Sequence, residues 1–327
     1  MFPSLETRLR TQLLDRRKKL QKAVTEVARK DKLTGLLREV DLALKKMDEG
    51  TYGLCETCHE TIEEERILAD PFSRNCLDHL TDEERKTLER DLDLAYEIQS
   101  ALLPKRNLRV DGWSIAHHYE PAGPVSGDYC DLILAPNEPG SVYFLLGDVS
   151  GKGVAASILM AHLHAMVRTL ALSNLSVGPL VERANRVFSE GTLSNHFATL
   201  VCGKATAMGH VELCNAGHCP PLHLHKGGVH RLVPTGVPIG LFSYSEFEVV
   251  KFDVQKGDSI LLYSDGLTES RNPSDQEYGE ERLISLVSSK STLSPTDLMA
   301  DCLKSLSDFR AGSPVSDDLT IMVLNRG

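Results

Sequence analysis

Apolar residues recur at helical spacing near the start of the chain and at strand spacing further on. Leu13, Leu20 and Val27 are seven residues apart, and from 33 to 47 the apolar positions step by four and three. Such a stripe is typical of helices that pack on another helix. A charged run near 29–35 interrupts it. We therefore expect one bent helix or a helical hairpin, which needs a partner helix in the same chain or another.

A second helical pattern follows a small block without strong periodicity. Thr81 and Glu84 have the spacing of a capping box, the apolar stripe continues to Leu102, and Pro104 ends it. Four segments result, and they predict the domain organisation: a coiled-coil-like helical segment at 1–50, a small block at 51–80, a linker helix at 81–104 and a large domain at 105–327.

The large domain alternates short β-rich runs with two pairs of helices. The expected strands are 113–119, 128–135, 141–149, 197–207, 210–215, 247–254, 258–264 and 319–325. The expected helices are 154–173, 177–190, 279–289 and 295–309. Strands grouped before and after a helix pair favour a layered α+β fold over alternating βαβ units.

Composition and charge narrow the class of protein. The 327 residues are 41% apolar and 25% charged with a net charge of −10, which indicates a globular chain and argues against one that coats nucleic acid. The basic segment 1–50 is more typical of a dimerising coiled coil than of a nucleic-acid surface. The longest apolar run, Val142 to Leu146, is strand-sized, and the N-terminus lacks the apolar core of a signal peptide. We expect a cytoplasmic protein with no membrane span.

Three cysteines and a histidine in the small block have the spacing of a zinc site. Cys55-x2-Cys58 is followed after 17 residues by Cys76-x2-His79. Paired knuckles of this kind close a tetrahedron around one Zn²⁺, and a closed four-ligand site is structural. His59 is an alternative fourth ligand, but it directly follows Cys58, which makes its geometry poor.

Four acidic motifs stand at strand ends or turns of the large domain. They are SGDYCD at 126–131, GDVSGKG at 147–153, YSDGLTE at 263–269 and SDDLT at 316–320. If those ends converge, Asp128, Asp148, Asp265 and one of Asp317 or Asp318 meet. Several carboxylates in one place need a positive counter-charge, and hard divalent cations such as Mg²⁺ or Mn²⁺ supply it. Taken singly, each motif is better interpreted as a turn or a cap; taken together in this order, they favour a metal site.

Six motifs in order resemble the metal-dependent protein phosphatase (PPM) family, in its SpoIIE/RsbU branch, over about 88–326. They are SGDYCD, GDVSGKGVAAS, NAGHCPPL, GVPIGL, YSDGLTE and DDLT. The resemblance implies an α-β-β-α sandwich of two antiparallel sheets flanked by helices. It implies a protein serine/threonine phosphatase in which a water bridging two Mn²⁺ or Mg²⁺ ions attacks phosphorus directly. The usual substrate in this branch is a phosphoserine on a STAS-domain anti-sigma-factor antagonist.

The resemblance also implies a role for individual residues. Asp148 should bridge both ions, and the Val149 carbonyl should help to bind one of them. Asp265 and Asp317 should bind the first ion and Asp128 the second, so these four aspartates are the expected catalytic set. Asp318 is a less favoured ligand than its neighbour Asp317. Gly127, which has no side chain, should leave space for the backbone beside the site. Lys152 could attract phosphate, and a solvated lysine before a helix is an equally good interpretation. His218 could touch substrate, although a turn shaped by Gly217, Pro220 and Pro221 is the favoured interpretation. Ser150 stands where eukaryotic members have a candidate general acid.

Residues 41–79 resemble the zinc finger of the DksA/TraR family, through "DEGTYG" and the cysteine pattern that follows it. In that family the finger accompanies a coiled coil that enters RNA polymerase. Two functions remain open at this point. One is a phosphatase that is controlled, and brought together as a homodimer, by the N-terminal helices and finger. The other is a non-catalytic scaffold that acts on RNA polymerase.

Overall fold

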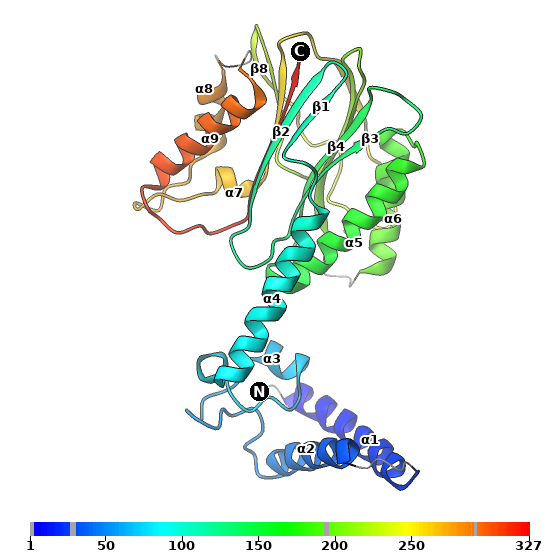
Figure 1. Cartoon of the computed structure of the whole chain (residues 1–327), viewed down its shortest axis with the longest axis vertical. Coiled ribbons are helices and arrows are strands. Elements are labelled where there is room, and N and C mark those ends of the chain that lie inside the picture. Colours follow the sequence, from blue (N-terminus) through cyan, green and yellow to red (C-terminus); the bar gives the residue numbers. More distant parts are fainter. Residues whose placement is uncertain (1–2, 27–30, 193–195, 289, 291–292) are drawn as a thin grey trace. The chain divides into compact units, whose positions relative to one another are not determined.

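The computed structural model describes residues 3–26, 31–192, 196–288, 290 and 293–327. The chain divides into two compact units, Met1–Asp91 and Leu92–Gly327, each with its own core (Figure 1). The division falls within helix α4 (Asp82–Leu102). The capping box that starts α4 is present: Thr81 N donates to Glu84 Oε2 at 2.9 Å, and Glu84 N donates to Thr81 Oγ1 at 3.2 Å.

The first unit opens with two helices that pack on each other, α1 (Pro3–Glu26) and α2 (Asp31–Asp48). Arg10 pairs with Asp48 and Arg17 with Asp41, so the helices run antiparallel. Of the two sequence-based alternatives, the hairpin is therefore correct. Leu9 and Leu13 of α1 join Val40, Leu44 and Met47 of α2 in one buried cluster, so the apolar stripe finds its partner within the chain.

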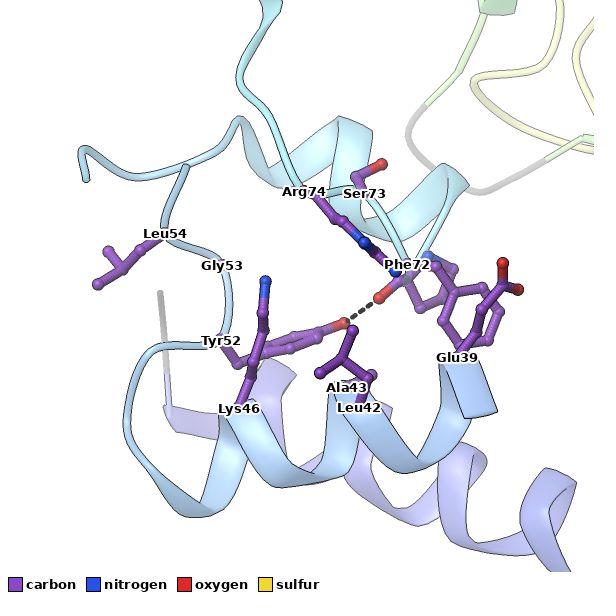
Figure 2. Close-up of a pocket in the computed structure, with 11 residues that line it drawn as sticks. Glu39, Leu42, Ala43, Lys46, Tyr52, Gly53, Leu54, Phe72, Ser73 and Arg74 are labelled. Atoms are coloured by element: carbon purple, nitrogen blue, oxygen red, sulfur yellow. Dashed lines mark hydrogen bonds between the residues drawn. The ribbon is translucent and has the colours of Figure 1, made fainter. Parts of the chain in front are cut away.

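The small block folds against α2 with little regular structure of its own. It contains α3 (Glu64–Ala69) and one 3-10 turn, η1 (Leu77–His79). Cys55, Ile62 and Ile67 belong to the same buried cluster as the helical hairpin. Figure 2 shows how Tyr52 lies over α2, where its hydroxyl donates to the Pro71 carbonyl at 2.9 Å and lines a small pocket.

The second unit contains two antiparallel sheets. The six-stranded sheet has the order β1-β2-β11-β10-β7-β8, and the five-stranded sheet has the order β3-β4-β5-β6-β9. The strands of the first are β1 (Asn107–Val110), β2 (Trp113–Glu120), β7 (Leu222–His225), β8 (Gly228–Arg231), β10 (Ser259–Tyr263) and β11 (Leu319–Arg326). Those of the second are β3 (Asp128–Leu134), β4 (Val142–Val149), β5 (Ala198–Ala205), β6 (His210–Ala216) and β9 (Val250–Asp253).

Helices cover the outer face of each sheet (Figure 1). Helices α5 (Gly153–Leu172) and α6 (Val177–Gly191) pack on the five-stranded sheet, and α9 (Pro295–Arg310) packs on the six-stranded one with α8 (Glu280–Val287) and α7 (Asp265–Thr268). A third apolar cluster, with Phe144, Ile260 and Met322, fills the space between the sheets. The α-β-β-α sandwich expected from the sequence is confirmed.

Each expected strand and helix of the large domain is present, but four short elements were not foreseen. They are β1, β7, β8 and α7, each four residues long. Four residues are too few to establish a period of two, and β1 and β8 are edge strands with mostly accessible side chains.

Helix α5 is long and strongly apolar. Within the described residues it is the one helix whose length and apolar composition are sufficient for a membrane span. Its buried side chains, such as Met160, Leu163 and Val167, pack with the sheet and α6 in one core cluster. The apolar character of α5 is thus accounted for by a face packed inside the sandwich.

Candidate active site

The pairing of β3 with β4 places Asp128 directly opposite Asp148. Asp128 is 1% exposed, and its backbone N–H donates to Ser126 Oγ at 3.0 Å. Two like charges directly opposite each other destabilise a sheet, so this pairing lowers the stability of the fold and is not explained by packing.

The other two motifs lie at the adjoining ends of β10 and β11. Asp265 begins α7 immediately after β10, and Asp317 and Asp318 precede β11. Gly266 permits this approach, because a Cβ there would lie 2.0 Å from the Asp318 carbonyl oxygen. The hydroxyl of Ser264 donates to that same carbonyl and accepts from Thr320 N.

A bond between the sheets joins the two halves of the site. Thr320 of β11 donates its hydroxyl hydrogen to Asp128 Oδ2 of β3. The aspartates of both sheets thereby become neighbours, as the sequence motifs predicted.

The carboxylates raise one another's pKa. Burial first and Asp148 second raise the pKa of Asp128 well above its ordinary value. Burial, Asp265 and Asp317 raise the pKa of Asp148 to about 7. Burial and Asp317 likewise raise the pKa of Asp265. The site therefore holds more negative charge than its surroundings neutralise.

Asp317 and Asp318 have different surroundings. Both carboxylate oxygens of Asp318 accept backbone N–H groups, from Ala122 at 2.7 Å and Gly127 at 2.9 Å. Asp318 thus holds the loop that leads to Asp128, whereas Asp317 is half-exposed and faces the cluster. This difference favours Asp317 as the ligand and gives Asp318 a role in the backbone around it.

Gly127 lies where a side chain would collide with the site. A Cβ on Gly127 would lie 3.0 Å from the Val149 carbonyl oxygen and 3.1 Å from Asp148 Oδ1. Val149 N donates in turn to the Gly127 carbonyl at 3.2 Å. The Val149 carbonyl thus borders the same space as the Asp148 carboxylate.

Lys152 brings a positive charge to the rim. Its Nζ donates to Asp317 Oδ2 and to the Ser316 carbonyl, both at 3.1 Å. The ammonium is bound to the acidic cluster here, and no anion is needed to explain its position.

His218 is buried and does not line an open surface, which favours the turn histidine over a residue that touches substrate. The residue is 5% exposed and its Nδ1 lies 2.8 Å from Thr199 Oγ1. Burial lowers its pKa to about 4, so the ring is neutral at physiological pH.

Four residues at the site were not singled out in the sequence, although Ser264 and Thr320 lie inside the YSDGLTE and SDDLT motifs. Ser264, Thr320 and Thr199 act through hydroxyl bonds to groups distant in the chain. Gln99 of α4 is buried, and its side-chain amide exchanges hydrogen bonds with both backbone groups of Ser126: Nε2 donates to the carbonyl at 2.8 Å and Oε1 accepts the N–H at 3.0 Å. No local pattern marks such long-range partners.

The donor set of the acidic cluster suits hard divalent ions. It consists of carboxylate and carbonyl oxygens, which Mg²⁺ and Mn²⁺ prefer. Among the described residues, the donor atoms of these aspartates do not all lie within 4.8 Å of one another.

The zinc-type cluster is closed and tetrahedral in outline. The donor atoms of Cys55, Cys58, Cys76 and His79 all lie within 4.8 Å of one another. Cys58 Sγ and Cys76 Sγ are 3.8 Å apart, and two thiolates at 2.3 Å from one zinc ion in a tetrahedron are also about 3.8 Å apart. His59, the alternative fourth ligand, is not part of the cluster.

Comparison with known proteins agrees with both sites. Residues 138–327 match the family model "Stage II sporulation protein E (SpoIIE)", and residues 50–84 match the "Prokaryotic dksA/traR C4-type zinc finger". His79 takes the place of the fourth cysteine in the cluster.

Individual relatives cover different shares of their own length. Protein IcfG of Synechocystis is 25% identical over 72% of this chain and 41% of its own length. Phosphoserine phosphatase RsbU of Bacillus subtilis is 24% identical over 74% of this chain and 72% of its own length. The structure of the RsbU and RsbW domains of Rv1364c from Mycobacterium tuberculosis superposes with a TM-score of 0.57 at 28% identity, covering 66% of this chain and 62% of that one. This chain belongs to the SpoIIE family: it carries a SpoIIE-type PP2C phosphatase domain and, before it, a DksA/TraR-type zinc finger.

Proposed function

We propose that this protein is a metal-dependent protein phosphatase that hydrolyses phosphoserine or phosphothreonine on a regulatory protein. The observation that carries the proposal is the convergence of Asp128, Asp148, Asp265 and Asp317 from both sheets, with the pKa values of the first three raised by burial and by one another. In a non-catalytic scaffold, the repulsion between these buried carboxylates would lower stability and serve no function.

Two Mn²⁺ or Mg²⁺ ions held by this set would supply an activated water and neutralise phosphoryl charge. Asp148 and the Val149 carbonyl would hold both ions, Asp265 and Asp317 would hold the first, and Asp128 would hold the second. Asp318 holds the backbone at Gly127. Lys152, which pairs with Asp317 here, would be available to an incoming phosphate if Asp317 held a cation instead.

The substrate class follows from the family. RsbU and RsbP of B. subtilis are named phosphoserine phosphatases. By analogy, the substrate proposed for this chain is a phosphoserine on a STAS-domain anti-sigma-factor antagonist.

The test is hydrolysis of a phosphoserine peptide and of p-nitrophenyl phosphate with Mn²⁺, with Mg²⁺ and with neither. Activity should require one of the ions and fall at least about 100-fold in Asp148→Asn and Asp265→Asn, because each removes a ligand charge. Asp258→Asn is the matched control, since Asp258 is a buried aspartate outside the cluster. Activity that persists without divalent ions, or in both ligand variants, would contradict the proposal.

We propose further that the N-terminal unit controls this activity through α4, and that the finger binds one structural Zn²⁺. Helix α4 begins in the first unit and ends in the second, where Gln99 holds the backbone of Ser126, two residues before Asp128. Gln99→Ala should lower Mn²⁺ affinity and activity together, whereas Gln255→Ala, an exposed glutamine, should change neither. If Gln99→Ala binds Mn²⁺ as tightly as the wild type, α4 does not act on the metal site and the proposed control through α4 is wrong.

A further inference from the structure

The NAGH turn carries the chain from one sheet to the other beside the aspartates. It follows β6 of the five-stranded sheet and precedes β7 of the six-stranded sheet. Asn215 fixes the backbone of His218 from both sides: Oδ1 accepts His218 N at 2.8 Å, and Nδ2 donates to the His218 carbonyl at 3.1 Å. Gly217 has a φ of +71°, and a Cβ there would lie 2.6 Å from Pro238. The backbone therefore leaves the imidazole little freedom of direction.

One edge of the ring contacts the strand next to Asp148. His218 Nδ1 lies 2.8 Å from Thr199 Oγ1. Thr199 is directly opposite Asp148 in the β4–β5 ladder, and its hydroxyl is 3.4 Å from the Asp148 carbonyl oxygen. The ring thus reaches the backbone of Asp148 through one hydroxyl group.

The other edge of the ring faces the strand that ends at Asp265. Tyr263, two residues before Asp265, acts on the ring through its backbone, which raises the pKa of His218 against the larger effect of burial. Nε2 is buried and has no hydrogen bond of regular geometry with any described residue. A buried polar atom without a full bond is costly, so its retention beside the acidic cluster calls for a function.

We propose that His218 is a positioning residue that sets the separation of Asp148 and Asp265 and so tunes the affinity of the acidic cluster for divalent ions. This proposal rests on the proposed two-metal function. Mg²⁺ and Mn²⁺ need oxygen ligands in closely defined places, and sites of this kind lose affinity when their support allows ligands to move by about 0.5 Å. The imidazole is a rigid group that contacts β5, whose Thr199 pairs with Asp148 of β4, and that lies near the end of β10, which leads to Asp265.

The experiment measures Mn²⁺ binding to the full, zinc-loaded chain by the loss of the free Mn²⁺ resonance in electron paramagnetic resonance. His218→Ala removes both contacts, and His218→Leu fills the volume without either. In His218→Asn the amide stands near Nδ1 and keeps the Thr199 contact, and in His218→Gln it stands near Nε2, on the side of Tyr263. We expect about 10-fold weaker Mn²⁺ binding in the Ala and Leu variants and intermediate values in the Asn and Gln variants, an order of magnitude equal to one lost hydrogen bond of about 1.4 kcal/mol.

His117→Gln is the matched control for loss of a buried histidine. His117 is 4% exposed, burial lowers its pKa to about 4, and its Nδ1 also lacks a partner. This variant should lose thermal stability in the metal-free state but keep its Mn²⁺ affinity. Equal Mn²⁺ affinity in wild type and His218→Leu, or an equal loss in His117→Gln, would overturn the positioning role. Absence of Mn²⁺ binding by the wild type would instead overturn the two-metal function itself.

Discussion

Thr320 of β11 donates its hydroxyl hydrogen bond to the carboxylate of Asp128 on β3, and this bond connects the two sheets at the end where the aspartates meet. It opposes the rise in the pKa of Asp128 that burial and Asp148 cause. Both partners are buried, so no water replaces the bond when it is lost.

Thr320→Val should therefore weaken metal binding while preserving side-chain shape. Hydrogen bonds to charged groups contribute about 1.5–3 kcal/mol, so Mn²⁺ affinity at pH 7 should fall about 10-fold or more. Calorimetric titration with Mn²⁺ measures it. Thr169→Val on α5 loses only a bond to its own helix, to the Ala165 carbonyl, and should bind as the wild type does. Similar affinities in both variants would show that the bond between the sheets does not matter to the ion.

The sequence located the aspartates because each stands beside a strongly patterned strand. Asp148 follows a run that is buried on both faces, and Asp265 follows another. The partners that organise them lie far away in the chain: Thr320 is 192 residues from Asp128, and Gln99 is 27 residues from Ser126. Hydroxyl and amide side chains at such separations leave no periodic trace, so only the folded arrangement identifies them.

The role of His218 could not be inferred from its motif for a related reason. The Gly- and Pro-rich motif left two interpretations of His218, a turn histidine and a residue that touches substrate. The turn crosses between two sheets, and the crossing buries the ring. Burial of a turn is a property of layer packing that a local pattern does not contain.

Metal-free stability should depend on pH in a defined direction. The folded-state pKa of Asp148 is about 7, above the ordinary value of 3.8, so between these values the folded protein binds more protons than the unfolded chain does. Stability therefore falls as pH rises through this window. Below pH 6.5 the buried histidines His117 and His218, whose pKa values are lowered to about 4, change stability in the opposite direction. We therefore expect the melting temperature without Mg²⁺ or Mn²⁺ to decrease from pH 6.5 to pH 8, and Asp148→Asn to lessen the decrease and to melt higher than wild type at pH 8. Asp258→Asn should keep the wild-type slope over this range. A melting temperature that rises from pH 6.5 to pH 8 would contradict the assignment.

Loss of one thiolate should release the zinc-type site and loosen the first unit. Cys55 and Cys76 are buried in the same cluster as Ile62 and Ile67, in a block with little regular structure to hold it. Cys58→Ser should lower bound zinc by about one equivalent per chain and expose 51–80 to limited proteolysis, because structural zinc contributes folding free energy directly. Metal content and cleavage sites, mapped by mass spectrometry, measure both effects. Cys219→Ser in the second unit should retain zinc; full zinc content in Cys58→Ser would refute the ligand assignment.

Gly127→Ala isolates the space between the Asp148 carboxylate and the Val149 carbonyl. The added methyl group would lie 3.0 Å from the Val149 carbonyl oxygen and 3.1 Å from Asp148 Oδ1, so at least one of these oxygens must shift by a few tenths of an ångström. Because both oxygens border the proposed ion positions, Mn²⁺ affinity and kcat/KM for p-nitrophenyl phosphate should each fall about 10-fold or more. Gly123→Ala in the same loop is the control, since its Cβ would meet only the Val125 carbonyl oxygen at 3.8 Å. If the two alanine variants bind Mn²⁺ equally well, the ions do not use the oxygens that Gly127 leaves uncovered, and the assignment of Asp148 as the shared ligand fails with them.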